Sequence, residues 1–454
     1  MSTLLKALKT KDFRKKFLFT VFAVAIVRLG CLLPIPGIDS AQVSAFLQSS
    51  LGDSFSLLNS FTGGSFLSMS VFALNVTPYI TASIIMQLLT IAIPALEEMQ
   101  RDGEDGRKRM NKITRYVTVL LAFIESASMA YAFAKQGTLG SNYNALNIVT
   151  MIAALICGAV LVMWIGERIT ENGIGNGISI ILLVNIISRM PNDFYTLYEQ
   201  FMKGKQIGPA LIAGCIIVGV VLFTTVFVII LSDAERHIPV QYSKKIQGRK
   251  QVGGQSTHIP LKVNTAGVIP IIFASSILQF PLIIQNLANY QSNGIPGKIL
   301  AALSSSQWFN MEHPLRSVGL LVYIALVIIF AYFYTAITFN PIEVANNMKK
   351  QGGFIPGIRP GKPTTEYLSK LLNHIIFIGA AGLVIVAVIP YFFNGIFSAN
   401  VSFGGTSLII VVGVILETKK QIESQILVRK YSGFLNDECK TLSCMITLQL
   451  FVVL

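Results

Sequence analysis

The sequence predicts an all-α membrane protein with ten transmembrane helices. Hydrophobic residues make up 53% of the 454 residues and charged residues only 13%, whereas soluble domains carry about 25% charged residues. The apolar residues fall into runs of roughly 18 to 23, the length that a helix needs to cross ~30 Å of hydrocarbon. Basic residues concentrate in every second connection between these runs. No large water-soluble domain is therefore expected.

Each predicted span is an apolar run bounded by charged or turn-forming residues. The ten spans are Phe17–Pro36, Val71–Ile93, Tyr116–Phe133, Ile148–Gly166, Ile174–Met190, Pro209–Leu231, Ala266–Leu287, Val318–Phe339, His374–Phe393 and Thr406–Leu427. The first run has no convincing small-residue cleavage site. We therefore expect it to be a retained helix and not a removed signal peptide.

The distribution of Lys and Arg predicts the orientation. Both residue types are abundant in the segment 1–16 and in the even-numbered connections, while the odd-numbered connections hold few. Those few are Lys135, Arg189, Lys203, Lys205, Lys298 and Arg316. By the positive-inside rule, we expect a multi-pass protein of the cytoplasmic membrane with both termini in the cytoplasm.

Two cytoplasmic connections, 233–262 and 340–373, are longer than ordinary turns between helices. They are rich in Lys, Arg, Gly and Gln, and the second contains the turn Gly357–Gly361. Topology alone explains such charges. Long basic projections are also surfaces on which ribosomal RNA or an acidic face of a motor protein can dock.

The segment Ser54–Ser70, between the first two spans, is semi-apolar, interrupted by glycine and free of basic residues. It is too short to cross a membrane. Irregular backbone at membrane depth survives only where protein or a water-filled cavity satisfies its polar groups. We therefore predict a re-entrant half-helix or plug here.

Charges within the spans are scarce, which argues against an ion or solute carrier. Arg28 lies near the outer end of the first span, where it can reach the interface. Glu125 is the one carboxylate deep in a span and needs a partner. The four histidines are far apart and no nucleophile is paired with a base, so we predict no enzyme, no metal site and no cofactor. Gly173–Gly177 lacks the Lys of a phosphate loop and is expected to be a tight turn.

Several stretches resemble bacterial members of the SecY family over about residues 15–435. The matching stretches are Leu33–Asp39, Pro78–Ile80, Ile84–Leu89, Gly173–Ile180, Gln255–Asn264, Phe339–Pro341, Phe354–Gly361 and Phe403–Ser407. The resemblance implies two pseudo-symmetric halves, spans 1–5 and 6–10, around an hourglass pore. It also implies a lateral opening towards lipid between the second and seventh spans.

This resemblance divides the chain into parts with expected roles. They are a basic cytoplasmic N-terminus (1–16), an N-terminal half (17–190) with a plug at about 54–70, an external hinge connection (191–208), a C-terminal half (209–435) with docking loops 233–262 and 340–373, and an atypical tail (436–454). Residues 441–454 are apolar where the family has a short polar tail, and we assign them no function.

Position matching to the family also implies site residues. The pore ring is Val76, Ile80, Ile178, Leu182, Ile272 and Ile410. The plug is Leu57, Leu58, Asn59, Phe61, Thr62, Gly63, Gly64 and Phe66. The lateral gate is Gln87, Glu125, Asn264, Ser276 and Phe280, and the docking residues are Arg249, Lys250 and Arg359. An all-aliphatic ring fits a narrow constriction that sheds water.

The expected function is a protein-conducting channel of the general secretory pathway, which passes unfolded preproteins and releases transmembrane segments laterally into lipid. The implied partners are SecE-type and SecG-type small subunits, the SecA ATPase, the ribosome, preprotein signal sequences and the lipid bilayer, with no DNA. Two alternatives stay open: a secondary solute transporter, since both can be built from two related halves, and an accessory SecY for specialised substrates.

Overall fold

The computed structural model describes residues 10–36, 38, 43, 59, 61–135, 145–203, 207–242, 245–247, 250–252, 256–288, 318–397 and 407–424. Most of them are helical. The labelled helices are α2 (Lys11–Gly30), α5 (Thr77–Ala92), α6 (Pro94–Arg101), α7 (Gly103–Lys135), α8 (Ala145–Asn172), α9 (Gly177–Phe201), α10 (Ile207–Asp233), α11 (Ile269–Ala288), α13 (Val318–Thr338), α14 (Pro341–Lys350) and α15 (Lys362–Phe397). A further helix covers residues 407–424 and is called the 407–424 helix.

A helix overlaps each of the ten predicted spans, although several helices extend well beyond the apolar run. Five of the described helices are long and apolar enough to cross a membrane. They are Gly103–Tyr131, Leu146–Asn172, Gly214–Asp233, Val318–Lys350 and Lys362–Ile389. Helices α5 and α6 make a sixth if taken together, although they meet at an angle of 109°. Helix α6 begins at Pro94, and Ile93 before it is extended. A residue before proline disfavours the helical conformation, which explains the bend.

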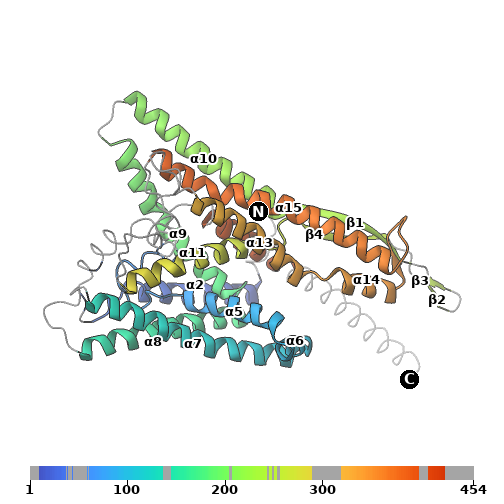
Figure 1. The fold of residues 1–454 in the computed structure, drawn as a ribbon, viewed down its shortest axis with the longest axis horizontal. Helices are drawn as coiled ribbons and strands as arrows, with labels where there is room; N and C mark the ends of the chain where they lie inside the picture. The colour runs from blue at the N-terminus through green and yellow to red at the C-terminus, as the bar shows by residue number, and fades with distance from the viewer. Residues whose placement is uncertain are drawn as a thin grey trace, which may run out of the picture.

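The helices form two groups with α9 between them (Figure 1). In the first group, α7 contacts both α5 and α8. In the second, α13 contacts α11 and α15, and α10 contacts α15. Helix α9 contacts α8 of the first group and α10 of the second. It continues through Pro191 to Phe201, so that helix occupies much of the segment 191–208 that we expected to be a connection.

The 407–424 helix contributes to both groups. Its residues Ile410, Val411 and Val414 belong to an apolar cluster with α2, α5, α8 and α9. Its residues Ile409 and Val412 belong to a second cluster with α10, α11, α13 and α15. One helix therefore joins the apolar cores of the two groups, with a different set of side chains for each.

The prediction of an all-α fold is wrong for the connection 233–262. It contains the strands β1 (Glu235–Tyr242), β2 (Lys245–Gln247), β3 (Lys250–Val252) and β4 (Ser256–Lys262), and β5 (Gly353–Phe354) comes from the second long connection. The sheet order is β4-β1-β5, with β1 antiparallel to both neighbours, and β2 and β3 form a separate hairpin.

The five strands and α14, which we call the arm, project beyond one end of the helical bundle (Figure 1). Alternate residues of β1, Ile238 and Val240, are buried in a cluster with Met348 of α14 and Leu368 of α15. This alternation is the pattern of a strand with one covered face. Lys420 ties the base of the arm to the 407–424 helix through Glu235, at 2.9 Å between Nζ and Oε1.

Candidate functional site

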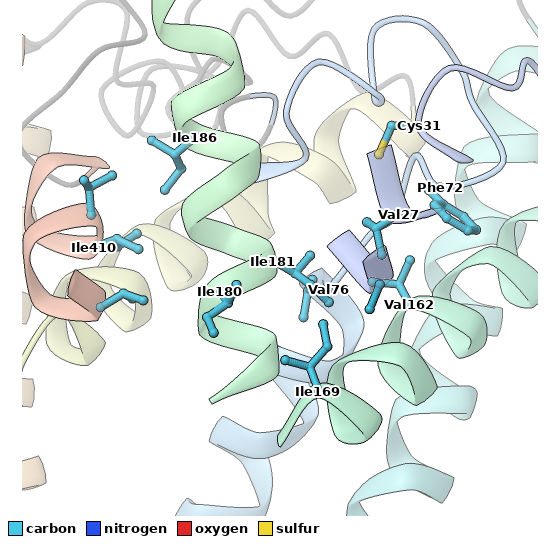
Figure 2. Packing of buried hydrophobic residues seen from close by; sticks show 13 residues of the cluster. Val27, Cys31, Phe72, Val76, Val162, Ile169, Ile180, Ile181, Ile186 and Ile410 are labelled. Carbon is cyan, nitrogen blue, oxygen red and sulfur yellow. The ribbon is translucent and has the colours of Figure 1, made fainter. Parts of the chain in front are cut away.

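Four of the six predicted ring residues lie in one apolar cluster. Val76 and Ile410 are buried in it, at 2% and 3% exposure, and Ile80 and Ile178 pack against it. Figure 2 shows Ile410 across from the face of α9 that carries Ile180 and Ile186. The cluster thus brings together side chains from α5, α9 and the 407–424 helix, which are far apart in the sequence.

The other two predicted ring residues lie elsewhere. Leu182 is buried one turn beyond Ile178 on α9 but is not a member of this cluster. Ile272 of α11 is half-buried, and its neighbour Ile271 packs in the second cluster with Ile409. Both residues are aliphatic, as expected for the ring. The six predicted ring residues, however, do not all belong to one apolar cluster.

The glycine-rich stretch before α9 is a tight turn, as predicted. Gly175 has φ +74°, a conformation that glycine adopts without strain. A Cβ on Gly177 would collide with the carbonyl oxygen of Gly166, so only glycine lets α8 and α9 approach here. The Asn176 side chain accepts a hydrogen bond from the Ile178 backbone N–H and caps α9. This turn determines the position of Ile178 at the start of α9.

The described part of the predicted plug, Asn59 and residues 61–70, is called the plug segment. Asn59 and Phe61 are helical, and residues 62–69 continue as successive turns. Leu57 and Leu58 lie outside the described residues. Two backbone hydrogen bonds secure the segment's end to the chain after α2, from Ile35 N to Met69 O at 3.1 Å and from Val71 N to Leu33 O at 2.9 Å. Phe61 packs against the cluster that contains Ile410.

Two arginines and an asparagine surround the plug segment. Asn185 of α9 is 1% exposed, accepts from Arg28 Nη1 at 3.3 Å and donates to the Phe61 carbonyl at 3.2 Å. With its amide turned to satisfy both groups, Asn59 accepts from Arg189 Nη2 at 2.8 Å. Arg189 is in turn paired with Asp193, one helical turn further along α9, at 3.6 Å.

Sequence reasoning missed this polar group. We expected Arg28 to reach the membrane interface, but in the structure it turns towards α9. Asn185 lies within an apolar run, and Arg189 was read only as one of the few basic residues on the outer side. The signal was present as three polar residues near one end of two spans, but their pairing depends on the packing of helices distant in the sequence.

In the described part of the chain, no hydrogen bond joins the predicted gate residues. Gln87 of α5 and Ser276 of α11 are exposed, and the Phe280 side chain lies outside what is described. The buried Asn264 Oδ1 atom has no hydrogen-bond partner among the described residues. Glu125 is on α7, which contacts both α5 and α11, but its carboxyl makes no ion pair or hydrogen bond with the described residues. The expected polar partner of Glu125 is therefore not found.

The predicted docking residues lie at the arm. Arg359 is exposed in the turn between β5 and α15, and Gly357 and Gly361 on either side have φ +83° and +110°. The Arg359 carbonyl accepts from Thr364 Oγ1 at 2.8 Å, which fixes the turn to the start of α15. Lys250 begins β3 at the outer hairpin, and Arg249 lies outside the described residues.

Within the described ranges, no group of three or more His, Cys, Asp or Glu residues is placed to hold a metal ion. Both helical groups contribute to an apolar cluster, and the plug segment packs beside it. Together with five described helices that are long and apolar enough to cross a membrane, this arrangement defines a helical membrane protein.

The comparisons with known proteins agree. The SecY family model matches residues 70–419. The protein translocase subunit SecY of Streptomyces coelicolor is 42% identical over 449 residues, which cover 95% of this chain and 98% of that protein. The chain belongs to the SecY family, and it is accordingly a multi-pass membrane protein.

Solved structures share the fold. One, described as the structure of a protein conducting channel, has a TM-score of 0.59 at 18% identity and covers 92% of this chain and 93% of its own. Another, the idle yeast Ssh1 complex bound to the yeast 80S ribosome, has a TM-score of 0.58 at 15% identity, with 93% and 90% covered.

Proposed function

We propose that the chain is the channel subunit through which unfolded preproteins cross the cytoplasmic membrane. The observation that carries this proposal is the aliphatic cluster of Val76, Ile80, Ile178 and Ile410, contributed by both helical groups. A narrow apolar constriction loses its water and blocks ions, yet flexible aliphatic side chains can part around a polypeptide of any sequence. Leu182 and Ile272 are assigned to the same ring by the family pattern alone.

The finer architecture follows the family pattern. Ten spans form two halves, 17–190 and 209–435, and both termini are cytoplasmic. The connection 191–208, most of which is the end of α9, is the outer hinge between the halves. Residues 54–70 are the plug that lies against the ring. The tail 436–454 has no assigned role.

The gate is the line between α5 and α11, along which transmembrane segments leave for lipid. Gln87, Glu125, Asn264, Ser276 and Phe280 border it. Because the buried Asn264 Oδ1 has no hydrogen-bond partner among the described residues, a backbone N–H or polar side chain of an entering signal sequence offers it the partner that a buried polar atom needs.

The arm is the dock for cytoplasmic partners. We assign SecA and the ribosome to the basic residues of the arm, with the exposed Arg359 as the first contact and Arg249 and Lys250 as further contacts. The match to a channel structure bound to a ribosome supports the ribosome assignment. SecE-type and SecG-type subunits complete the complex. Energy comes from the docked partner, so the chain itself is not an enzyme.

ATP-dependent transport of a signal-bearing preprotein into proteoliposomes with SecA and the small subunits tests this function. We expect protease-protected preprotein with the wild-type chain and a loss of at least about tenfold with Arg359→Glu, because charge reversal opposes an acidic partner. Lys108→Glu is the matched control, since Lys108 is an exposed cation on α7, away from the arm.

Full transport by Arg359→Glu would show that Arg359 is not a docking residue, and it would not contradict the channel function. No protected preprotein from correctly inserted wild-type complex, together with uptake of a small solute, would favour the transporter alternative.

A further inference from the structure

We propose that Arg28, Asn185 and Arg189 are positioning residues that latch the plug segment to the N-terminal half, so that plug release is a step separate from the parting of the halves. This inference rests on the proposed channel function. It goes further because it assigns the residues that hold the plug at rest and the half on which the plug stays.

Asn185 is the first part of the latch. Its amide uses both ends, accepting from Arg28 of α2 at 3.3 Å and donating to the Phe61 carbonyl at 3.2 Å. With 1% exposure, it is shielded from water. Hydrogen bonds in such a low-dielectric setting are strong, and a buried polar group left without one is destabilising. The amide therefore ties α2, α9 and the plug segment into one unit.

Arg189 is the second part. With the Asn59 amide oxygen turned towards it, its guanidinium donates to Asn59 at 2.8 Å. Its pairing with Asp193 at 3.6 Å holds it in position on α9. A hydrogen bond from a charged donor is roughly twice as strong as one between neutral groups. Asn59 itself is only 3% exposed, so the contact is enclosed by the protein.

Two glycines of the plug segment adopt backbone conformations that other residues rarely take. Gly63 has φ +66°, and a Cβ there would lie 2.5 Å from Arg28 Nη1 and 3.1 Å from the Asn185 Cα. Gly64 has φ +89°, and a Cβ there would lie 3.6 Å from Arg189 Nη1. The turn between the two arginines therefore requires glycine at positions 63 and 64, because both have positive φ.

These latch residues all lie between positions 28 and 189, in the N-terminal half. The backbone bonds to Leu33 and Ile35 belong to the same half. Towards the other half, Phe61 of the plug segment packs against the apolar cluster to which Ile410 belongs. When the halves part, Ile410 can move away while every hydrogen bond of the latch stays intact. Opening the gate and freeing the plug are thus separable.

A labelling experiment tests the latch without relying on transport. Thr62 is fully buried in the plug segment, so Thr62→Cys, in full-length complex without the five native cysteines, reports plug release by its maleimide labelling rate. We expect Asn59→Ala to raise this rate about tenfold, which corresponds to about 1.4 kcal/mol. The matched control is Asn192→Ala, an exposed asparagine on the same helix as Arg189.

A double-mutant cycle separates a specific contact from general loosening. Because Asn59 and Arg189 form one pair, Asn59→Ala combined with Arg189→Gln should label no faster than the faster single variant. Idle ion conductance in planar bilayers should rise in parallel. Cross-linking of a bound signal sequence to Ser276→Cys on α11 should stay unchanged, since the gate is a separate step.

Labelling of Asn59→Ala at the rate of Asn192→Ala, or additive effects in the double variant, would overturn the latch. Loss of signal-sequence cross-linking in Asn59→Ala would overturn the separation of the two steps. If the wild-type complex transports no preprotein, the channel function fails, while the labelling rates still decide whether the latch exists.

Discussion

At the scale of single residues, the constriction that we propose would depend on buried aliphatic side chains. Ile410 is a β-branched residue on the 407–424 helix at 3% exposure, whereas Ile415 on the same helix is 50% exposed. The same residue type therefore has two environments within about one and a half turns. We therefore expect Ile410 to contribute to the ion seal of the proposed constriction and Ile415 not to, because only Ile410 is buried in the cluster.

We expect Ile410→Asn to raise the ion conductance of the idle channel about tenfold, because an amide in the constriction keeps water there. Ile415→Asn is the control, since the same chemical change lies outside the cluster. Conductance of reconstituted channels in planar bilayers measures both. Equal conductance of the two variants would show that Ile410 is not part of the seal.

The sequence could predict which kinds of residue build the site but not all of their contacts. The aliphatic identity of Val76, Ile178 and Ile410 is visible in the sequence, and the resemblance to a family supplied their grouping. The pairing of Arg28 with Asn185 joins residues 157 positions apart. Hydropathy and charge patterns carry no information on such pairs, because they average over neighbours in the chain.

At the scale of elements, the arm shows where composition misleads. The connection 233–262 is polar, basic and rich in glycine, a composition that predicts a loop. Yet Glu235–Tyr242 alternates buried and exposed residues, and the segment Ser256–Lys262 pairs with it along its length. A period of two over a few residues is a weak signal beside ten long apolar runs. The helical elements were predictable because their signal extends over some twenty residues each.

This alternation allows a matched test of the arm. Val240 is fully buried between β4 and α15, whereas the next residue, Gln241, is exposed. We expect Val240→Asp to unfold the arm, because an unpaired buried carboxylate costs several kcal/mol, about 3 or more. Gln241→Asp should be tolerated. Limited proteolysis of membrane vesicles should cut the arm of the first variant quickly and leave the helical bundle intact.

Preprotein transport should fail in parallel in Val240→Asp, while insertion of the chain into the membrane stays normal. Resistance of the Val240→Asp arm to protease, at the level of Gln241→Asp, would contradict the packing of β1 against α15.

At the scale of the whole molecule, the number of membrane crossings decides the topology. Among the described residues, length and composition identify five crossing helices, or six with the bent pair, whereas the apolar runs of the sequence predict ten. Helix α9 shows why the two counts differ. Asn185, Arg189 and Asp193 lower its hydropathy, although they pack inside the protein. A helix that faces its own protein does not need the apolar surface of one that faces lipid.

Cysteine labelling resolves this point. In a background without native cysteines, we expect Asp105→Cys to react with an impermeant maleimide only from the cytoplasmic side and Lys203→Cys only from the outside. Both positions are exposed, at the two ends of the stretch that contains α7, α8 and α9. Labelling of both from one side would mean that α9 does not cross, since α7 and α8 alone return the chain to its starting side.

The length of α15 has a mechanical consequence. It runs for 36 residues, about 54 Å, and starts directly after the turn that holds Arg359. Its first part, with Leu368 and Ile375, packs in the arm, and its later part, with Leu383 and Val386, packs with α10 and α13. One continuous helix therefore connects the arm to the apolar core of the second helical group. If Arg359 is the docking residue that we propose, a partner that displaces the arm would also displace the part of α15 that carries Leu383 and Val386.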